Sequence, residues 1–454
     1  MKPIPTIALL FNRIRKSSFL KSVLTLSSGV VIAQGINFLG MPVVGRVYTP
    51  AAMGDYTIIT TNANVISSVA CLGMMTAFML PEKDEEARGL SRLVTYSTIL
   101  ITTLAVLGLW LCSDLYRIFS TEETPYTTAL IVLWLYIISY MVSNICYAYV
   151  NRRKLYRVMF WNPVFTTVIN VGCGIIFGLL GWGFVGYTAA HILSFGVNIL
   201  HLMHHANPYE QIGDPAYRCI SLLKSYRRFP IYQMPANLIA NVGTQIPVQS
   251  IEGLYSSAAL GMYSMALKIL SLPTSLLATP INRVYFQEAS RRYSRGEDIG
   301  EFSFKVLETN IKIAILPISV LIIFGQWIFA IFLGEQWREA GRFASILGIY
   351  ELMKFCTSCL SGDFVIIKKN SWNLISSIIT LFINLLLLVL CNSVLQLSVF
   401  GFLALMSAVM TIKIIGAEAV FFYYVGISMK RYFWFLCKYI VLPFCISFGI
   451  NVLL

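Results

Sequence analysis

The sequence predicts an all-α, multi-pass membrane protein built as two bundles of six helices around a central cavity. Of its 454 residues, 57% are apolar and 12% are charged, about half the charged share of a soluble domain. Apolar stretches of about twenty residues, the length of a membrane-spanning helix, recur along the chain. The basic residues cluster in alternate loops, as they do in multi-pass membrane proteins, where every second loop is cytoplasmic. A soluble enzyme is therefore excluded.

The apolar stretches define the expected helices. The gaps between them are too short for a catalytic domain, the longest being 205–229 and 283–307. Lipid offers no partners to backbone groups, and the stretches are too long for barrel strands, so helices are expected. A further stretch, 433–453, is either a thirteenth span or an interfacial helix. The twelve expected spans are 19–44, 55–80, 92–113, 126–150, 158–181, 183–204, 230–252, 258–282, 308–333, 343–366, 372–394 and 398–425.

The positive charges predict the orientation. With a cytoplasmic N-terminus, 25 of the 34 Lys and Arg residues fall in cytoplasmic segments, and four fall in the opposite loops. This asymmetry is typical of an N-in topology in a cytoplasmic membrane. Most of the net charge of +13 is thereby explained as topology. The four on the opposite side are Arg46, Arg117, Arg338 and Arg342.

A short motif occurs twice, which predicts an internal duplication. The pattern Y-x-x-A-A-[ML]-G-x-Y begins at Tyr48 and again at Tyr255, an offset of 207 residues. Each copy follows the first helix of a six-helix block, and such blocks give parallel repeats around an axis along the membrane normal. The expected division is an N-terminal cytoplasmic or interfacial segment 1–18, an N-lobe 19–204, a cytoplasmic linker 205–229, a C-lobe 230–425 and a C-terminal hydrophobic segment 426–454.

Polar side chains at helical spacing mark the faces that avoid lipid. Such stripes indicate a hydrated cavity between the bundles, although small and hydroxyl residues also join helices to one another. The amides on these stripes are candidate substrate-binding residues: Gln34, Asn37, Asn64, Asn237, Asn241 and Gln245.

Charged residues inside the spans are the second set of candidates. Lys268, Lys354 and Lys413 lie deep in their spans, where an isolated ammonium group needs water, an acidic partner or an anionic ligand. Glu351, three residues before Lys354, could neutralise it. Arg46, at the outer end of the first span, is counted with these lysines as a cavity candidate.

The carboxylates inside spans or near their ends could carry a coupling ion, either H⁺ or Na⁺. No cofactor and no metal centre are expected, and the sequence contains no phosphate-binding loop for ATP hydrolysis. The four candidates for ion coupling are Glu252, Glu351, Asp363 and Glu418.

Several motifs together resemble those of Wzx-like polysaccharide flippases, a branch of the multidrug/oligosaccharidyl-lipid/polysaccharide exporter superfamily. They extend over about residues 40–425. Two features depart from the relatives: Ser358–Ser361, where relatives often carry Pro, and the odd thirteenth stretch. The matching segments are Arg46-x-Tyr48-Thr-Pro50-x-x-x-Gly54-x-Tyr56, Tyr149-Val-Asn151-Arg152-Arg153-Lys-Leu-Tyr156, Phe229-Pro230 with Pro235 and Pro247, Leu260-Gly261-x-Tyr263-Ser-x-Ala266-x-Lys268 with Pro273 and Pro280, and Gly334-x-x-Trp337-x-x-Ala340-Gly341.

The resemblance implies a substrate and a location. Such proteins move an undecaprenyl-diphosphate-linked oligosaccharide across the bacterial inner membrane by alternating access, for O-antigen, capsule or exopolysaccharide assembly. Expected partners are this lipid-linked sugar, membrane lipids and the polysaccharide polymerase or chain-length machinery, but no nucleic acid. Lys268 is the preferred partner of the diphosphate.

Two alternatives remain open. A cation-coupled drug or small-molecule exporter of the same superfamily would favour deep carboxylates over deep lysines, the reverse of the balance found here. A membrane-embedded O-antigen polymerase or ligase would need a large outer loop, and the expected outer loops are short.

Overall fold

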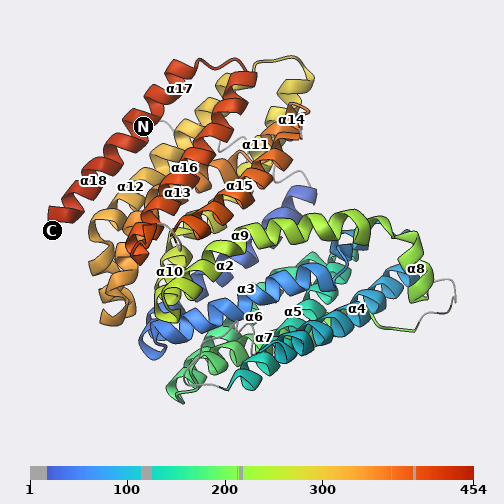
Figure 1. The fold of residues 1–454 in the computed structure, drawn as a ribbon. Coiled ribbons are helices and arrows are strands. Elements are labelled where there is room, and N and C mark those ends of the chain that lie inside the picture. The colour runs from blue at the N-terminus through green and yellow to red at the C-terminus, as the bar shows by residue number, and fades with distance from the viewer. Residues whose placement is uncertain are drawn as a thin grey trace. The chain divides into compact units, whose positions relative to one another are not determined.

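The computed structural model describes residues 18–113, 125–211, 213, 218–369, 371–391 and 395–453, and every regular element among them is helical (Figure 1). The expected interfacial segment 1–18 lies, apart from Ser18, outside the described residues, as does Arg117. By the contacts within the chain, the residues divide into two compact units. One consists of the residues up to Val47 together with Ile59–Asn241, and the other of Tyr48–Ile58 together with Val242–Leu454.

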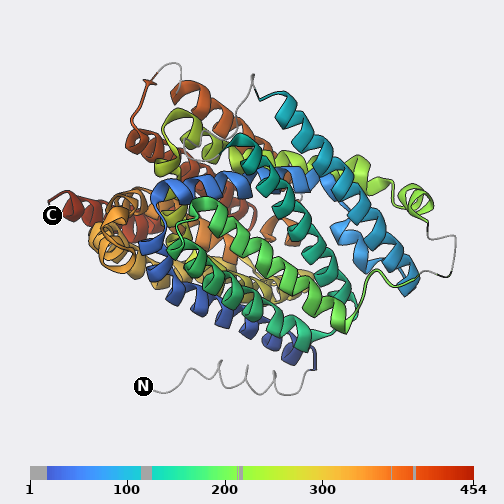
Figure 2. The ribbon, with the colours of Figure 1, turned by 90° about the horizontal axis from the view of Figure 1, so that it is seen from below.

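The first unit is a helical bundle in which α2 packs along α6, and α7 packs on both α5 and α6 (Figure 2). The close approach of α2 and α6 depends on Gly29 and Gly40, where a Cβ would collide with Phe160 and Val171. The elements are α2 (Ser18–Val47), most of α3 (Pro50–Ala70), η1 (Met74–Met79), α4 (Asp84–Leu111), α5 (Tyr126–Arg152), α6 (Tyr156–Leu179), α7 (Gly183–His205), α8 (Cys219–Ser225), η3 (Phe229–Gln233) and the start of α9 (Met234–Leu254).

The second unit packs α13 between α12 and α16 (Figure 1). Gly325 of α12 and Gly341 of α13 bring the two backbones together, as small residues do between helices in membranes. The elements are the start of α3, the rest of α9, α10 (Ser257–Leu270), η4 (Thr274–Ala278), α11 (Thr279–Ser294), α12 (Gly300–Leu333), η5 (Glu335–Trp337), α13 (Arg338–Cys359), α14 (Asp363–Ile366), α15 (Ser371–Leu390), α16 (Val399–Tyr424), α17 (Met429–Leu436), η7 (Cys437–Val441) and α18 (Leu442–Leu453).

Eleven helical segments of the described chain are long and apolar enough to cross a membrane. The helices α3 and α9, each of 21 residues, are not among them, and these carry two of the polar stripes in the sequence. The C-terminal stretch qualifies as one membrane-length segment, Met429–Asn451. The prediction of an all-α, multi-pass membrane protein is confirmed.

Several expected spans differ from the helices in their limits, the second and the ninth among them. The second was expected at 55–80, but α3 begins at Pro50 and ends at Ala70, because Leu72 and Gly73 adopt left-handed conformations with φ of 52° and 66°. The short 3₁₀ helix η1 then follows. The ninth was expected at 308–333, but α12 begins already at Gly300. Asp298 accounts for this earlier start, because its side chain accepts the N–H of Gly300 at 2.7 Å.

The repeated motif forms a reciprocal contact within the second unit. A Cβ on Gly54 would lie 1.8 Å from the carbonyl oxygen of Ser257, and a Cβ on Gly261 would lie 1.8 Å from that of Pro50. Gly54 and Gly261 are equivalent under the 207-residue offset, and so are Pro50 and Ser257. The two glycines therefore have the same packing role, because each lets one copy of the motif approach the backbone of the other. This shared role explains why the glycine occurs in both copies.

Candidate functional site

The candidate amides fall mainly in the first unit. Gln34 and Asn37 on α2 are half-buried, and Asn64 on α3 is exposed. Asn237 and Asn241 also belong to this unit, since the first two turns of α9 group with it. Gln245, one turn further along α9, belongs to the second unit. The residues are polar and accessible, as binding residues must be, and their role in substrate binding stays a prediction.

The helix α9 contacts different neighbours at its start and at its middle. At its start, Gly73 lies so close that a Cβ would be 2.8 Å from the Met234 nitrogen. Further along, Asn384 of α15 donates its side-chain N–H to the carbonyl of Gly243 at 2.7 Å. Asn237 accepts a hydrogen bond from the Gln233 amide at 2.9 Å. The amides of α9 thus lie on a helix that packs against other elements at its start and at its middle.

The cationic candidates differ in their surroundings. Lys268 is half-buried on α10, two residues before the C-terminal end of that helix, and Lys413 is half-buried on α16. Arg46 is exposed in the last turn of α2, where its guanidinium donates to the carbonyl of Pro42 at 2.9 Å. The contacts of Arg46 therefore include a local helix cap.

Lys354 forms the local ion pair that its spacing allowed. Its Nζ lies 3.0 Å from Oε1 of Glu351, whose side chain is fully buried, whereas the Lys354 side chain is 42% exposed. The ammonium also lies 5.6 Å from the centre of the Tyr350 ring, a cation–π distance. Glu351 is thus neutralised within its own helix, which makes it a poor site for a coupling ion.

Glu252 is likewise engaged, because it accepts the hydroxyl of Ser257 at 2.7 Å. Ser257 is the first residue of α10, so the carboxylate lies near a helix N-terminus, where partial positive charge favours it. The hydrogen bond from Ser257 therefore gives the Glu252 carboxylate a structural role at the start of α10.

Glu418 and Asp363 form a different arrangement in the core of the second unit. Glu418 on α16 is 6% exposed, and neither oxygen of its carboxylate has a hydrogen-bond partner. The carboxyl groups of Glu418 and Asp363 act on each other electrostatically. Tyr285 on α11 donates its hydroxyl to Asp363. Tyr432, whose hydroxyl donates to the Ile415 carbonyl at 3.2 Å, also interacts with the Glu418 carboxyl.

This pair of carboxyl groups lacks a compensating cation. Among the described residues, neither Glu418 nor Asp363 lies within ion-pairing distance of a basic side chain. A buried carboxylate without donors, such as Glu418, is costly, so this carboxyl group beside Asp363 is suited to holding a proton or a small cation. The described residues contain no group of three His, Cys, Asp or Glu side chains arranged for a metal ion.

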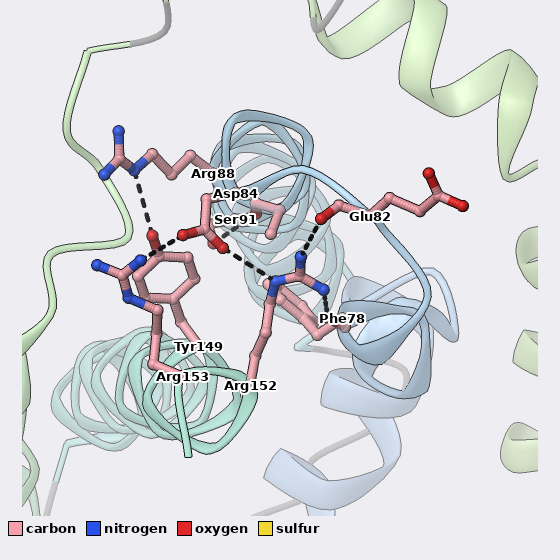
Figure 3. A network of polar contacts seen from close by, with 9 residues as sticks. Phe78, Glu82, Asp84, Arg88, Ser91, Tyr149, Arg152 and Arg153 are labelled. Atoms are coloured by element: carbon pink, nitrogen blue, oxygen red, sulfur yellow. Dashed lines mark hydrogen bonds and ion pairs between the residues drawn. The ribbon is translucent and has the colours of Figure 1, made fainter. Parts of the chain in front are cut away.

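Sequence reasoning missed the polar partners that come from distant segments. Asp363 and Tyr285 are 78 residues apart, and no local pattern links them. The same holds for a network at one end of α4 and α5, where Asp84 pairs with Arg152 and Arg153, and Tyr149 accepts a hydrogen bond from Arg88 at 3.2 Å (Figure 3). The sequence offers only the RR pair, which the charge pattern assigns to topology.

The fold is similar to that of solved membrane transporters. It is similar to a lipid II flippase, MurJ, in an inward closed conformation, with a TM-score of 0.67 and 13% identity over 94% of this chain and 98% of that one. It is also similar to an inward-facing multidrug resistance MATE family transporter of the MOP superfamily, with a TM-score of 0.61 and 13% identity over 87% and 98% of the two chains. The chain thus shares its overall fold with these two proteins.

The sequence itself identifies the family. A model of the polysaccharide biosynthesis protein family matches residues 43–342, and the chain belongs to this family. No curated protein matches the chain by sequence. Both repeated motifs, around Gly54 and around Gly261, lie within the matched range.

Proposed function

We propose that the protein is a flippase that moves undecaprenyl-diphosphate-linked oligosaccharide repeat units across the bacterial inner membrane. The product would enter O-antigen, capsule or exopolysaccharide assembly. The observation that carries this proposal is a polysaccharide biosynthesis family match within a chain whose fold is similar to a lipid II flippase. Lipid II flippase is the name of that relative, and its kind of substrate, a lipid-linked saccharide, is what we extend to this chain.

The residues suit such a substrate. Amides such as Asn37, Asn64 and Asn241 provide both donors and acceptors for sugar hydroxyls. The diphosphate requires a cation, and Lys268, which is half-buried on α10, is our candidate. In this proposal the protein works by alternating access, inserts with a cytoplasmic N-terminus, and delivers its product to a polymerase and chain-length machinery.

We also propose that transport is coupled to H⁺ or Na⁺. Of the four candidate carboxylates, Glu351 and Glu252 have local partners, whereas Glu418 is buried without one. The Glu418–Asp363 pair is therefore the best candidate for the coupling site. A drug exporter is the second candidate function, favoured by the likeness to MATE transporters.

The proposal is tested in a strain that lacks its own surface-glycan flippase. Without the protein, lipid-linked repeat units should accumulate on the cytoplasmic leaflet, and expression of the chain should restore the surface glycan. A surface-glycan defect that arises before the lipid-linked unit is made would overturn the proposal. Drug resistance without glycan rescue would favour the exporter instead.

A further inference from the structure

The described residues between α7 and α9, within the stretch expected as a cytoplasmic linker, pack against the first unit. Ala206 and Leu222 are buried, at 7% and 2% exposure. Ala206 belongs to the same apolar cluster as Ala87 of α4, and Tyr209 packs against that cluster. The helix α8 contacts α4. The described parts of 206–226 are therefore packed against the first unit, whereas a flexible hinge would have few buried contacts.

Polar contacts at the start of the segment reinforce this docking. The guanidinium of Arg92 donates to the carbonyls of Tyr209 and Glu210, at 3.1 and 2.8 Å. Arg88 forms an ion pair with the Glu210 carboxylate. The hydroxyl of Thr95 donates to a carbonyl of its own helix, so the Tyr209 hydroxyl, 2.9 Å away, donates to Thr95. Side chains on three successive turns of α4 thus bind two consecutive residues, Tyr209 and Glu210.

A second grip holds the end of the segment. The hydroxyl of Tyr226 donates to Oε1 of Glu86 at 2.8 Å. Burial, together with the Glu86 carboxylate, raises the pKa of Tyr226 to about 12, so this hydroxyl keeps its proton at physiological pH. A charge-assisted hydrogen bond of this kind is stronger than a neutral one. Both ends of the segment are therefore attached to one helix.

The arginines involved could instead be a landing site for an anionic headgroup. Their contacts argue against it. Arg88 is already paired with Glu210 and with the Tyr149 hydroxyl (Figure 3), and the Arg92 guanidinium is directed to two backbone carbonyls. Asp84 occupies the neighbouring Arg152 and Arg153. Each of these four arginines therefore already has a partner within the first unit.

We propose that α4 clamps the described residues of this segment, 206–211 and 218–226, so that they move as a part of the first unit and any joint between the units lies after Tyr226. Arg88, Arg92 and Glu86 are the positioning residues of this clamp. Their role is to keep the segment attached to the first unit, so that any motion of this unit is passed directly to the start of α9. The clamp does not depend on the identity of the transported molecule.

The experiment measures distances between spin labels in the protein without substrate, reconstituted in nanodiscs. One pair joins Ile220 on α8 to Leu100 on α4, two residues that are 76% and 61% exposed. The wild type should give a single narrow distribution. The variants Arg92→Ala and Tyr226→Phe should broaden it. The control Lys154→Ala removes an exposed charge near the same end of α5 and should leave the distribution unchanged.

A second pair keeps the test decisive if a variant fails to fold. Labels on Ile220 and on Leu316 of α12 should give the same number of distance populations as labels on Leu100 and Leu316, because α8 follows α4. A broad Ile220–Leu100 distribution in the wild type, or one that Arg92→Ala leaves unchanged, would overturn the clamp. Failure of glycan rescue in the deletion strain would instead concern the proposed function and leave these distances untouched.

Discussion

Lys268 and Lys354 look alike in the sequence, since both are single lysines within apolar spans. The structure separates them, because Lys354 has Glu351 at 3.0 Å. A carboxylate one turn away satisfies a buried ammonium group and leaves it less available to a ligand. Lys354 thereby becomes the weaker candidate for the diphosphate, and the role of Lys268 stays a prediction. The spacing of Glu351 and Lys354 allowed this pair to be predicted.

We expect Lys268→Ala to abolish glycan export in the complementation strain, because the diphosphate loses its cation. Lys268→Arg should retain part of the export, since it keeps the charge. The matched control is Lys312→Ala, which removes a lysine that is paired at the surface with Glu308 at 2.6 Å. Surface glycan is quantified at equal protein levels in the membrane. Full export by Lys268→Ala would show that another group binds the diphosphate.

At Glu418 we expect a loss of ion coupling. In the wild type, an imposed proton or sodium gradient should accelerate transport in proteoliposomes, whereas Glu418→Gln should transport at the same rate with or without the gradient. The amide keeps the shape of the side chain but cannot carry the ionic charge. Glu297→Gln, at an exposed position, is the control. Normal stimulation of Glu418→Gln would place the coupling site elsewhere.

Among the elements, helix type and approximate position could be predicted, because long apolar stretches have one economical structure in lipid. The end of α3 could not, because it depends on two residues with positive φ rather than on hydropathy. Nor could the docking of 206–226, since its carbonyls meet Arg92 across more than a hundred positions of sequence. The repeated Y-x-x-A-A-[ML]-G-x-Y motif was visible, but its packing role was not.

The crossing of α3 and α10 leads to a stability prediction. Gly54→Ala and Gly261→Ala each place a methyl group against a backbone carbonyl, and overpacking of this kind costs about 1–3 kcal/mol. Each should lower the thermal unfolding temperature in detergent. Gly416→Ala on α16 is the control, because a Cβ there meets nothing within 4 Å and Ala favours the helix. Equal unfolding temperatures for all three variants would contradict the close crossing.

For the whole molecule, the fold class and the family resemblance could be predicted, because composition, span length and motif order are properties of the entire sequence and do not depend on any single contact. The division into units could not be located as closely. The sequence placed the boundary in 205–229, whereas contacts place it between Asn241 and Val242, within α9, and group Tyr48–Ile58 with the second unit. The predicted lobes 19–204 and 230–425 stay a prediction about the moving parts.

The C-terminal segment decides on which side the chain ends. With a cytoplasmic N-terminus, eleven candidate spans plus α3 and α9 put the C-terminus outside. Alkaline phosphatase, which is active only outside the cytoplasm, should be active when fused after Leu453 and inactive when fused after Val425. A fusion after His205, expected inside, serves as the control. Activity of both the Val425 and His205 fusions would invert the orientation.

The central claim is that this chain moves a lipid-linked oligosaccharide across a membrane. The purified protein is reconstituted in liposomes that carry a polyprenyl-diphosphate-linked oligosaccharide, and the fraction in the outer leaflet is read by a membrane-impermeant lectin or glycosidase. We predict that this fraction rises over time with the wild-type protein and stays at the protein-free level with Lys268→Ala. A wild-type protein that leaves the leaflet distribution unchanged, while transporting a drug cation in the same liposomes, would contradict the claim.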